Sequence, residues 1–394
     1  MRCFKFLLVF FLLLSIFTIT GCSSFTLKVT WRKIHGYSKN ELVNSCIETR
    51  DGSYLFAGMS NSKNPNGEDD FYLLKIDKWG NVLGEWFHYG ERDDNAQCVI
   101  ETSDGGILVL GESYSYATGI SKDLYVVKLD KKGNIVWAKN FGGVDMDGGR
   151  SAIEDSDGNY ILVGWTRSFG AGNSDFYMIK LSPNGEQLWS KTWGGRNFDE
   201  ANCILESEDG NYLIAGYTLS FGGGGKDIAL IKIDKNGNLV WYRTYGGARD
   251  DSASAIIKTI DGNYLLVGST FSYGSKGDIY VLKVNSAGNI IWERNFGGEE
   301  SEEGVCVVNT KDGGFVIVGS TRSYGVMGLG VYILKISSSG EPLWYKVYDG
   351  EGDDEGRTVL ELEDGSLLVG GLTRSWGAQA SDVLILKLNF KGEL

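Results

Sequence analysis

Acidic residues recur at regular intervals in this sequence, and together they could form a binding or catalytic site. Most of seven similar segments have one acid shortly before a small residue, at Asp94, Asp147, Asp199, Asp251, Glu302 and Asp354, with Asn40 in the first segment. A ring of carboxylates could hold a cation, a sugar or an extended peptide, and two carboxylates at a defined separation could cleave a glycosidic bond. The sequence singles out no pair for that reaction, so we assign no catalytic residue.

Serine–aromatic pairs recur further along the same segments, at Ser115–Tyr116, Ser168–Phe169, Ser220–Phe221, Ser272–Tyr273, Ser323–Tyr324 and Ser375–Trp376. Because chain direction alternates from strand to strand, the pairs and the acids should lie on one face of the molecule. Their near-identical repetition favours a structural role, since an asymmetric ligand rarely needs identical contacts from every segment. The acids would then hydrogen bond to the serines, and the aromatic rings would wedge between segments.

Residues that differ between the segments are better candidates for ligand binding. They are cationic or aromatic side chains on this face: Arg150, Arg167, Arg322, Arg357, Arg374 and Trp376. Arg150 and Arg357 are expected near the axis, where their positive charge would offset the acids. The loops after the second predicted strand also vary most between segments, and variable loops on a rigid scaffold commonly carry binding residues. An envelope protein or a glycan is the expected class of ligand.

Histidine and cysteine, the usual residues of metal and nucleophilic sites, are sparse. His35 and His88 stand alone near the ends of predicted fourth strands, which is a poor basis for general-base or metal chemistry. Cysteines in the predicted first strands stand at or next to a position where other segments have small residues, so we expect buried free thiols at Cys46, Cys98, Cys203 and Cys306. No Cys-x-x-Cys pair occurs, and the sequence predicts neither a metal site nor a cofactor.

All of these residues belong to a repeat with a spacing of 51–53 residues. An Asp-Gly dipeptide marks each copy and begins at Asp51, Asp104, Asp157, Asp209, Asp261, Asp312 and Asp364. Each copy contains four short β-like runs separated by turn signals, of which Asp-Gly is a favoured hairpin dipeptide. Four antiparallel strands in each of seven copies predict an all-β fold, a seven-bladed β-propeller.

The ends of the chain predict how this propeller closes. The last copy stops at Leu394 after its third strand and so lacks a fourth. We expect residues 27–34 to supply that strand by pairing near residues 384–388, which would remove two sheet edges. Trp31 stands five residues before Gly36, as the fourth-strand tryptophans of later copies stand before their glycines. A single sheet of all the strands is the alternative and would leave this one unpaired. The propeller domain is then expected to span residues 22–394.

Composition agrees with an exported β-protein and disfavours nucleic acid as a partner. The chain has 56 glycines against 3 prolines, as expected for many tight turns. Its formal net charge of −13 repels phosphate backbones, so we expect no nucleic-acid binding.

The N-terminus has the features of an export signal. Arg2 and Lys5 precede a nearly unbroken apolar run, and small residues lead to Gly21 and Cys22. This ending resembles the bacterial lipobox, whose cysteine is acylated and becomes the first residue of the mature protein. The resemblance implies a signal peptide over residues 1–21, lipidation of Cys22, and an exported protein anchored by lipid to the cell membrane or the outer membrane. A membrane-spanning anchor is the alternative, but the apolar run is short for a span and the cysteine would be unexplained.

The segment after each third strand resembles the docking motif of quinoprotein-type (PQQ-like) propeller repeats, in which an Asp, a turn Gly and a Trp lock adjacent blades. The match is clearest at Asp130, Gly133 and Trp137, with one residue fewer between Asp and Gly than in that family. The first copy departs further, because Trp86 lies six residues after Gly80 where other copies have a spacing of four.

This resemblance implies two different functions. Some propellers of the family are dehydrogenases that use a quinone and calcium, and others are cofactor-free scaffold lipoproteins. The lipobox and the lack of catalytic insertions make this chain similar to the second kind. We therefore expect a non-enzymatic binding or scaffold protein at the cell envelope. An extracytoplasmic enzyme acting on polysaccharide, or a quinone-dependent dehydrogenase, is the alternative.

Overall fold

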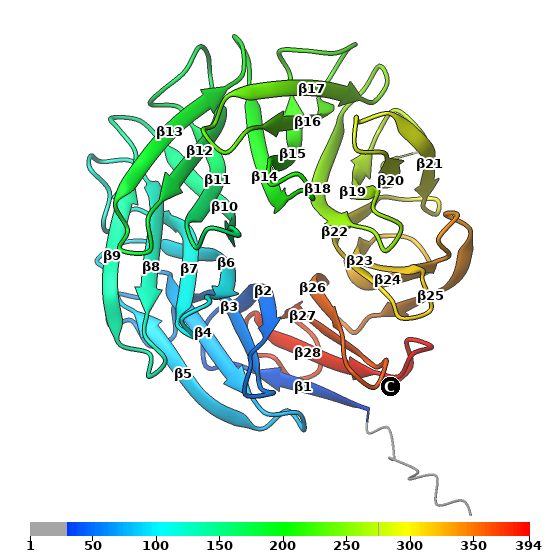
Figure 1. Cartoon of the computed structure of the whole chain (residues 1–394). Helices are drawn as coiled ribbons and strands as arrows, with labels where there is room; N and C mark the ends of the chain where they lie inside the picture. Colours follow the sequence, from blue (N-terminus) through cyan, green and yellow to red (C-terminus); the bar gives the residue numbers. More distant parts are fainter. Residues whose placement is uncertain (1–29, 275) are drawn as a thin grey trace, which may run out of the picture.

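The computed structural model describes residues 30–274 and 276–394, and the regular elements in this part of the chain are all β-strands. They form seven antiparallel sheets of four strands, arranged as blades in a ring (Figure 1). The predicted seven-bladed β-propeller is therefore confirmed. The described part of the chain contains no helix with the length and hydropathy needed to cross a bilayer. The expected signal peptide (residues 1–21) and Cys22 lie outside the described residues.

Six blades take their strands in chain order from the axis outward, and the seventh takes β1 as its outermost strand. We number the blades 1 to 7 in the order of their innermost strands. The innermost strands are β2 Glu41–Glu48, β6 Asp94–Glu101, β10 Asp147–Glu154, β14 Asp199–Glu206, β18 Asp251–Lys258, β22 Glu302–Asn309 and β26 Asp354–Glu361. The second strands are β3 Tyr54–Ser60, β7 Ile107–Ser113, β11 Tyr160–Thr166, β15 Tyr212–Thr218, β19 Tyr264–Thr270, β23 Phe315–Thr321 and β27 Leu367–Thr373.

The two outer strands complete each blade. The third strands are β4 Asp70–Ile76, β8 Asp123–Leu129, β12 Asp175–Leu181, β16 Asp227–Ile233, β20 Asp278–Val284, β24 Gly330–Ile336 and β28 Asp382–Leu388. The outermost strands are β5 Val82–His88, β9 Ile135–Phe141, β13 Gln187–Trp193, β17 Leu239–Tyr245, β21 Ile290–Phe296, β25 Pro342–Tyr348 and, in blade 7, β1 Trp31–His35.

The hydrophobic core lies between the blades and not at the axis. Second and third strands such as β11 and β12 are buried along their whole length, as expected for strands covered on both faces. Their side chains form seven apolar clusters, each shared by two neighbouring blades. The axis is therefore lined by the innermost strands, whose side chains are free to be polar.

The two ends of the strands define two faces of the ring. The turn face carries the Asp-Gly turns between first and second strands and the turns between third and fourth strands. The loop face carries the loops between second and third strands and the connections between blades. The acids and serine–aromatic pairs all belong to the loop face, as predicted.

Strand β1 closes the ring by pairing antiparallel with β28, from Trp31 opposite Lys387 to His35 opposite Val383. The predicted closure is confirmed, with the strand observed over residues 31–35, whereas the prediction was 27–34. Residues 27–29 lie outside the described residues. Because Trp31 pairs near the end of β28, β1 begins at the turn face.

A tryptophan in the fourth strand packs on a turn glycine of the next blade. A Cβ atom added to Gly185 would lie 2.9 Å from the Trp137 ring of the preceding blade, and one on Gly80 would lie 2.9 Å from the Trp31 ring. These glycines also have φ near +80°, a conformation that other residues rarely adopt. The Trp137 indole N–H donates to the carbonyl of Pro183 in the same turn, at 3.1 Å. Each such contact fixes one blade against the next.

Trp31→Ala tests the closing contact. It removes a half-buried indole that covers Gly80, and we expect a loss of about 3 kcal/mol in the free energy of unfolding. Chemical denaturation of the mature protein measures this. Trp79→Ala is the matched control, because Trp79 is 56% exposed in a turn of blade 1 and should cost under about 0.5 kcal/mol. Equal stability of the two variants would show that β1 does not hold the ring.

The ring of acids at the loop face is structural. The buried Asp147 accepts hydrogen bonds from the Gly143 N–H at 2.9 Å and from the Ser168 hydroxyl at 2.7 Å. The aromatic partner Phe169 lies against Gly143, where a Cβ would collide with Ser168. Asp199 and Asp251 make the same pair of bonds in the next blades. The acids thus tie each blade connection to the neighbouring loop.

In blade 1 the prediction that Asn40 occupies the position of the acids is wrong. Glu41 begins β2 and is buried, and its carboxylate accepts from the Tyr37 N–H and the Ser60 hydroxyl, both at 2.8 Å. The side chain at this position must accept hydrogen bonds from two donors, and the two oxygens of a carboxylate do this better than the single oxygen of an amide. Asn40 instead accepts from Ser381 of blade 7, which completes the ring on this face.

A second set of acids begins the third strands, at Asp70, Asp123, Asp175, Asp227, Asp278 and Asp382. Burial raises the pKa of Asp70 to about 6, and the negative charges of Asp94 and Asp69 add to the rise against the opposing hydrogen bond from Gly90. On the turn face the balance is reversed. Burial alone would raise the pKa of Asp104, but hydrogen bonds from Thr102, the Gly106 N–H and Lys128 lower it to about 2. The two faces therefore respond to pH in opposite senses.

These shifts predict how stability changes with pH. The pKa of Asp70 is higher in the folded chain than in the unfolded chain, where it is about 4, so the folded state holds the extra proton between these values. Stability should therefore fall as pH rises from about 4 to about 6, and Asp70→Asn should reduce that fall. Asp104→Asn is the control, since the stabilisation from Asp104 is nearly complete above about pH 5 and the variant should leave the slope between about pH 5 and 6 unchanged. Melting temperatures across this range that fall equally in wild type and Asp70→Asn would contradict the assignment.

Candidate functional site

A β-bulge in each innermost strand supplies the side chains that line the axis. The register of β10 with β11 shifts between Gly149 and Ser151, which leaves Arg150 as an extra residue, and the same shift recurs in every blade. A bulge of this kind bends the strand and redirects a side chain. The bulge residues are Asn44, Gln97, Arg150, Asn202, Ser254, Val305 and Arg357.

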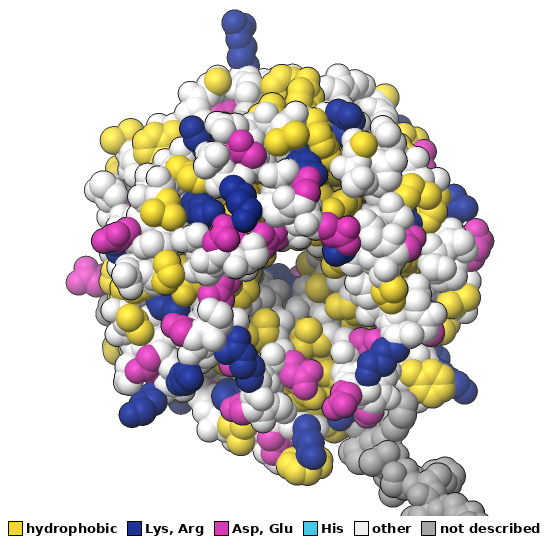
Figure 2. All heavy atoms as spheres, in the orientation of Figure 1, with side chains coloured by type: hydrophobic (Ala, Val, Ile, Leu, Met, Phe, Trp, Pro, Cys, Tyr) yellow, Lys and Arg dark blue, Asp and Glu magenta, His cyan; other side chains and the backbone are white. Residues whose placement is uncertain are grey.

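All seven bulge residues line one cavity of about 760 Å³, which we call the axial pocket. It extends toward the loop face, where Glu200, Tyr217 and Lys226 also line it. Figure 2 shows the hollow at the centre of the ring with both basic and acidic side chains around it. The pocket is therefore polar and of mixed charge, and the side chain that lines it varies between blades.

One side of the axial pocket is built around Arg357. Its guanidinium donates to the Asn44 amide oxygen at 2.6 Å and to the Glu355 carboxylate at 2.9 and 3.2 Å. Glu303 lines the pocket in the preceding blade. The surrounding protein desolvates its carboxyl and raises its pKa, and the negative charge of Glu355 raises it further against the opposing charge of Arg357. The Arg357 guanidinium is therefore bonded to Glu355, while its charge also acts on the desolvated carboxyl of Glu303.

The other side is built around Tyr217 and two cations. The ammonium of Lys226 lies 4.2 Å from the centre of the Tyr217 ring. Burial and then the charge of Glu200 raise the pKa of the Tyr217 phenol, so it stays a neutral hydroxyl. Arg150 lies within 3.9 Å of Glu112, which also pairs with Lys122 at 2.8 Å. This side can offer hydroxyl, ammonium, guanidinium and carboxylate groups to one polar ligand.

The structure brings two of the predicted binding residues, Arg150 and Arg357, into the axial pocket. The guanidinium of Arg167 instead lies 5.6 Å from the centres of both the Trp165 and Phe198 rings. The other three candidates are also absent from the residues that line the pocket. Arg374 is exposed and pairs with Asp353, Arg322 is exposed, and the Trp376 ring stacks on Arg32 at 4.3 Å.

Sequence reasoning missed most of the pocket. The unpredicted charged and aromatic residues are Glu200, Tyr217, Lys226, Glu303 and Glu355. A signal for them exists in the repeat. Glu200 and Tyr217 face each other at a strand pair whose equivalent in blade 5 is Ser252 and Ser269, so side-chain type changes at a fixed position between copies.

The histidines and the described cysteines are held by hydrogen bonds, ring stacking or burial. His35 bonds to Glu85 at 3.0 Å, and the His88 ring stacks on Trp86 and Tyr116. Cys46, Cys98, Cys203 and Cys306 form no disulfide, and burial raises the pKa of each thiol, to about 12 at Cys46. Within the described residues no group of three or more His, Cys, Asp or Glu side chains is placed to hold a metal ion.

Comparisons with known proteins agree on the fold. Residues 156–187 match a domain of unknown function described as a β-propeller, DUF5122. The regulatory protein FlaEY of Caulobacter vibrioides is 25% identical over an alignment of 172 residues, and the match covers 37% of this chain. The match spans 18% of the length of FlaEY.

Solved structures with low identity also resemble this chain. The Neurospora crassa Pan2 WD40 domain has a TM-score of 0.55 at 10% identity, with 89% of this chain and 91% of that chain covered. The Penicillium chrysogenum α-L-arabinanase complexed with arabinobiose scores 0.52 at 14% identity, covering 93% and 99%. The extracellular domain of BT4673 from B. thetaiotaomicron, described as a hybrid two component system, scores 0.51 at 11% identity, covering 90% and 42%. At these identities the likeness concerns the fold, and the chain is a β-propeller protein.

Proposed function

We propose that this protein is an exported, lipid-anchored β-propeller that binds a polar ligand at its axial pocket and acts as a binding or scaffold protein without catalysis. The observation that carries the proposal is the ring of bulge residues. The same backbone position reaches the pocket in every blade, and its side chain changes among arginine, asparagine, glutamine, serine and valine. Because the surrounding framework repeats closely, this variation supports selection for an asymmetric ligand.

The chemistry of the axial pocket favours a ligand rich in hydrogen-bonding groups, such as a glycan or an extended peptide. Arginine, lysine and carboxylate groups are all present, so the pocket complements a neutral or zwitterionic ligand better than a strongly charged one. An envelope protein or glycan is therefore the proposed partner, and nucleic acid is not.

The proposed lipid anchor is compatible with this site. An acylated Cys22 would stand shortly before β1, and the residues between them span at most about 30 Å when fully extended. Since β1 is entered at the turn face, the anchor would hold that face toward the membrane. The loop face and the mouth of the axial pocket would then point away from the lipid. The lipobox supports this proposal, as does the resemblance to cofactor-free quinoprotein-type scaffold lipoproteins.

A hydrolase acting on polysaccharide is the second candidate, and one observation favours it. The carboxyl pKa of Glu303 is raised, in part by the negative charge of Glu355, and glycoside hydrolysis uses a carboxylic acid of raised pKa together with a second carboxyl group. The partners of Glu355 argue for binding instead, because Arg357 already holds its carboxylate. An assay for new reducing ends on any glycan that binds separates the two functions. No described feature favours the quinone-dependent dehydrogenase.

The double substitution Arg150→Ala and Arg357→Ala tests the site. Charge-assisted hydrogen bonds contribute roughly 1.5–3 kcal/mol each, so we expect binding of envelope glycans or peptides to weaken at least about tenfold. Affinity capture from envelope extracts, followed by titration of the identified ligand, measures this. The melting temperature should change little, because both side chains are partly exposed in the pocket.

Arg322→Ala with Arg374→Ala is the matched control. It removes the same charge from exposed positions of the loop face outside the axial pocket. Binding should be retained in this variant. An equal loss in both double variants would mean that ligand binding depends on overall charge and not on the pocket.

Cys22→Ser tests the anchor. Acylation requires the cysteine sulfur, so the variant should incorporate no palmitate in metabolic labelling and should accumulate as uncleaved or mislocalised protein. Cys46→Ser is the control, since that thiol is buried within β2. Labelling of Cys22→Ser at the wild-type level would contradict the lipoprotein proposal.

A further inference from the structure

The contact between blades 1 and 2 differs from the other contacts around the ring. At the described contacts elsewhere, an indole covers the turn glycine of the next blade: Trp31 on Gly80, Trp137 on Gly185, Trp189 on Gly237, Trp241 on Gly288, Trp292 on Gly340 and Trp344 on Gly392. Gly133 is the equivalent turn glycine of blade 2, and a Cβ atom added to it would meet nothing within 4 Å. No indole covers this glycine.

The sequence explains this difference. Gly84 of β5 pairs with Lys75, as Trp137 of β9 pairs with Lys128 in the next blade, so Gly84 holds the position of the docking tryptophan. Trp86 stands two residues further along, and its ring stacks on His88 with the ring centres 5.5 Å apart. It therefore does not reach Gly133.

The exposure of Lys75, which pairs with Gly84, is consistent with the absence of an indole at this position. The Lys128 side chain is 3% exposed, and its equivalents beside Trp189, Trp241, Trp292 and Trp344 are similarly buried. Lys387, beside Trp31 in the closing blade, is partly buried. Lys75 is 35% exposed, although it forms the same kind of ion pair, with Asp51 at 2.7 Å. Solvent thus enters where an indole lies in other blades.

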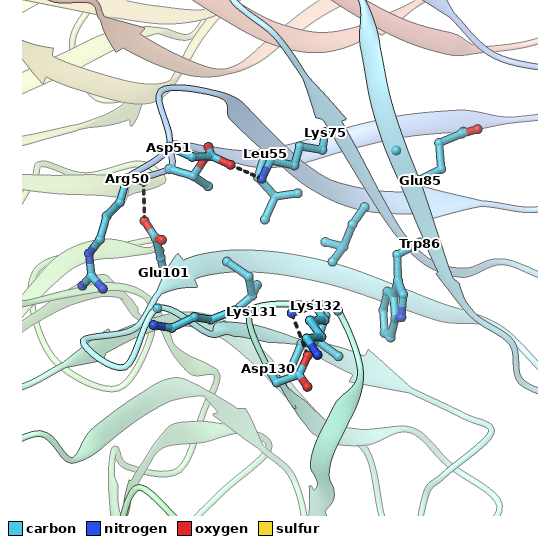
Figure 3. Close-up of a pocket in the computed structure, with 17 residues that line it drawn as sticks. Arg50, Asp51, Leu55, Lys75, Glu85, Trp86, Glu101, Asp130, Lys131 and Lys132 are labelled. Carbon is cyan, nitrogen blue, oxygen red and sulfur yellow. Dashed lines mark hydrogen bonds and ion pairs between the residues drawn. The ribbon is translucent and has the colours of Figure 1, made fainter.

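A cavity of about 670 Å³ opens at this place, between Gly84 and Gly133, and we call it the inter-blade slot. Its apolar lining is Leu55, Leu73, Ile107, Leu129 and Trp86. Figure 3 shows Trp86 along one end, Lys131 and Lys132 on the turn of blade 2, and Arg50, Asp51 and Glu101 toward the other end. The volume lies within the range of roughly 300–1,000 Å³ typical of small-molecule pockets.

The other blades show what chemistry this surface accepts. The indole N–H of Trp137 donates to the carbonyl of Pro183, and that of Trp189 donates to the carbonyl of Lys235, both at 3.1 Å. Lys131 has the equivalent place in the turn of blade 2 and lines the slot. A flat ring entering here would find apolar walls, a glycine beneath it, and a backbone carbonyl for an N–H donor.

We propose that the inter-blade slot between Gly84 and Gly133 is a second binding site, specific for an indole-sized aromatic ring with an N–H donor. This site is separate from the axial pocket and does not depend on the function proposed for it. The ring can belong to a small molecule or to a tryptophan of another polypeptide, because the contacts that recognise it are those of the indole alone.

Titration of the mature protein with indole and with N-acetyltryptophanamide, followed by calorimetry and saturation-transfer NMR, tests the proposal. We expect one molecule of indole to bind per chain. Binding of N-acetyltryptophanamide as well would indicate a site open to a polypeptide-borne ring, and binding of indole alone would indicate a small-molecule site. Wild-type protein that binds neither probe would overturn the proposal.

Gly84→Trp supplies the ring from within the chain. A Cβ at Gly84 meets nothing within 4 Å, so the new indole can lie on Gly133 as Trp137 lies on Gly185. We expect a melting temperature raised by several degrees and at least a tenfold loss of indole affinity. Gly84→Ala is the matched control and should bind indole like the wild type. Unchanged indole affinity in Gly84→Trp would also overturn the proposal.

Discussion

Except between blades 1 and 2, neighbouring blades are held together by an indole packed on a turn glycine, with an apolar cluster beneath each contact. The glycine is required twice, by its positive φ and by the approach of the ring, so no other residue type serves well at that position. The contact recurs at six of the seven blade junctions, and each such contact fixes one blade against the next. Strand β1 belongs to this arrangement because it brings Trp31 to Gly80 and pairs the free edge of β28.

The closed ring separates positions that hold the fold from positions that are free to vary. The buried acids, their serines and the docking tryptophans recur because the same local geometry recurs in each blade. The bulge residues meet a different requirement, since they face the axial pocket and contribute little to the clusters between blades. One blade can therefore have arginine where another has serine or valine, and the mixed charge of the axial pocket has little effect on the packing between blades.

The fold could be predicted well from the sequence because the turn and strand patterns repeat at a regular spacing. The Asp-Gly series set the blade boundaries, and the position of Trp31 indicated the closing strand. The error at Asn40 came from a single position of alignment, which only the hydrogen bonds of Glu41 resolve. The axial pocket was predicted in part, through Arg150 and Arg357. The other bulge residues depend on a register shift in β-pairing, which a sequence does not show, whereas Glu200 and Tyr217 are indicated only by a change of side-chain type between copies. The displacement of Trp86 was visible in the sequence, but the inter-blade slot required knowing that no other side chain in the described part of the chain covers Gly133.

The central claim is that ligand recognition resides where the blades differ around the axis. Hydroxyl-radical footprinting of the protein with and without its captured envelope ligand tests this claim most directly, because it reads individual side chains. We predict protection of Tyr217 and of the bulge residues of the axial pocket, with unchanged reactivity at the exposed Trp79 and Phe390 of the turn face. Protection confined to the turn face, with Tyr217 equally reactive in both states, would contradict the account.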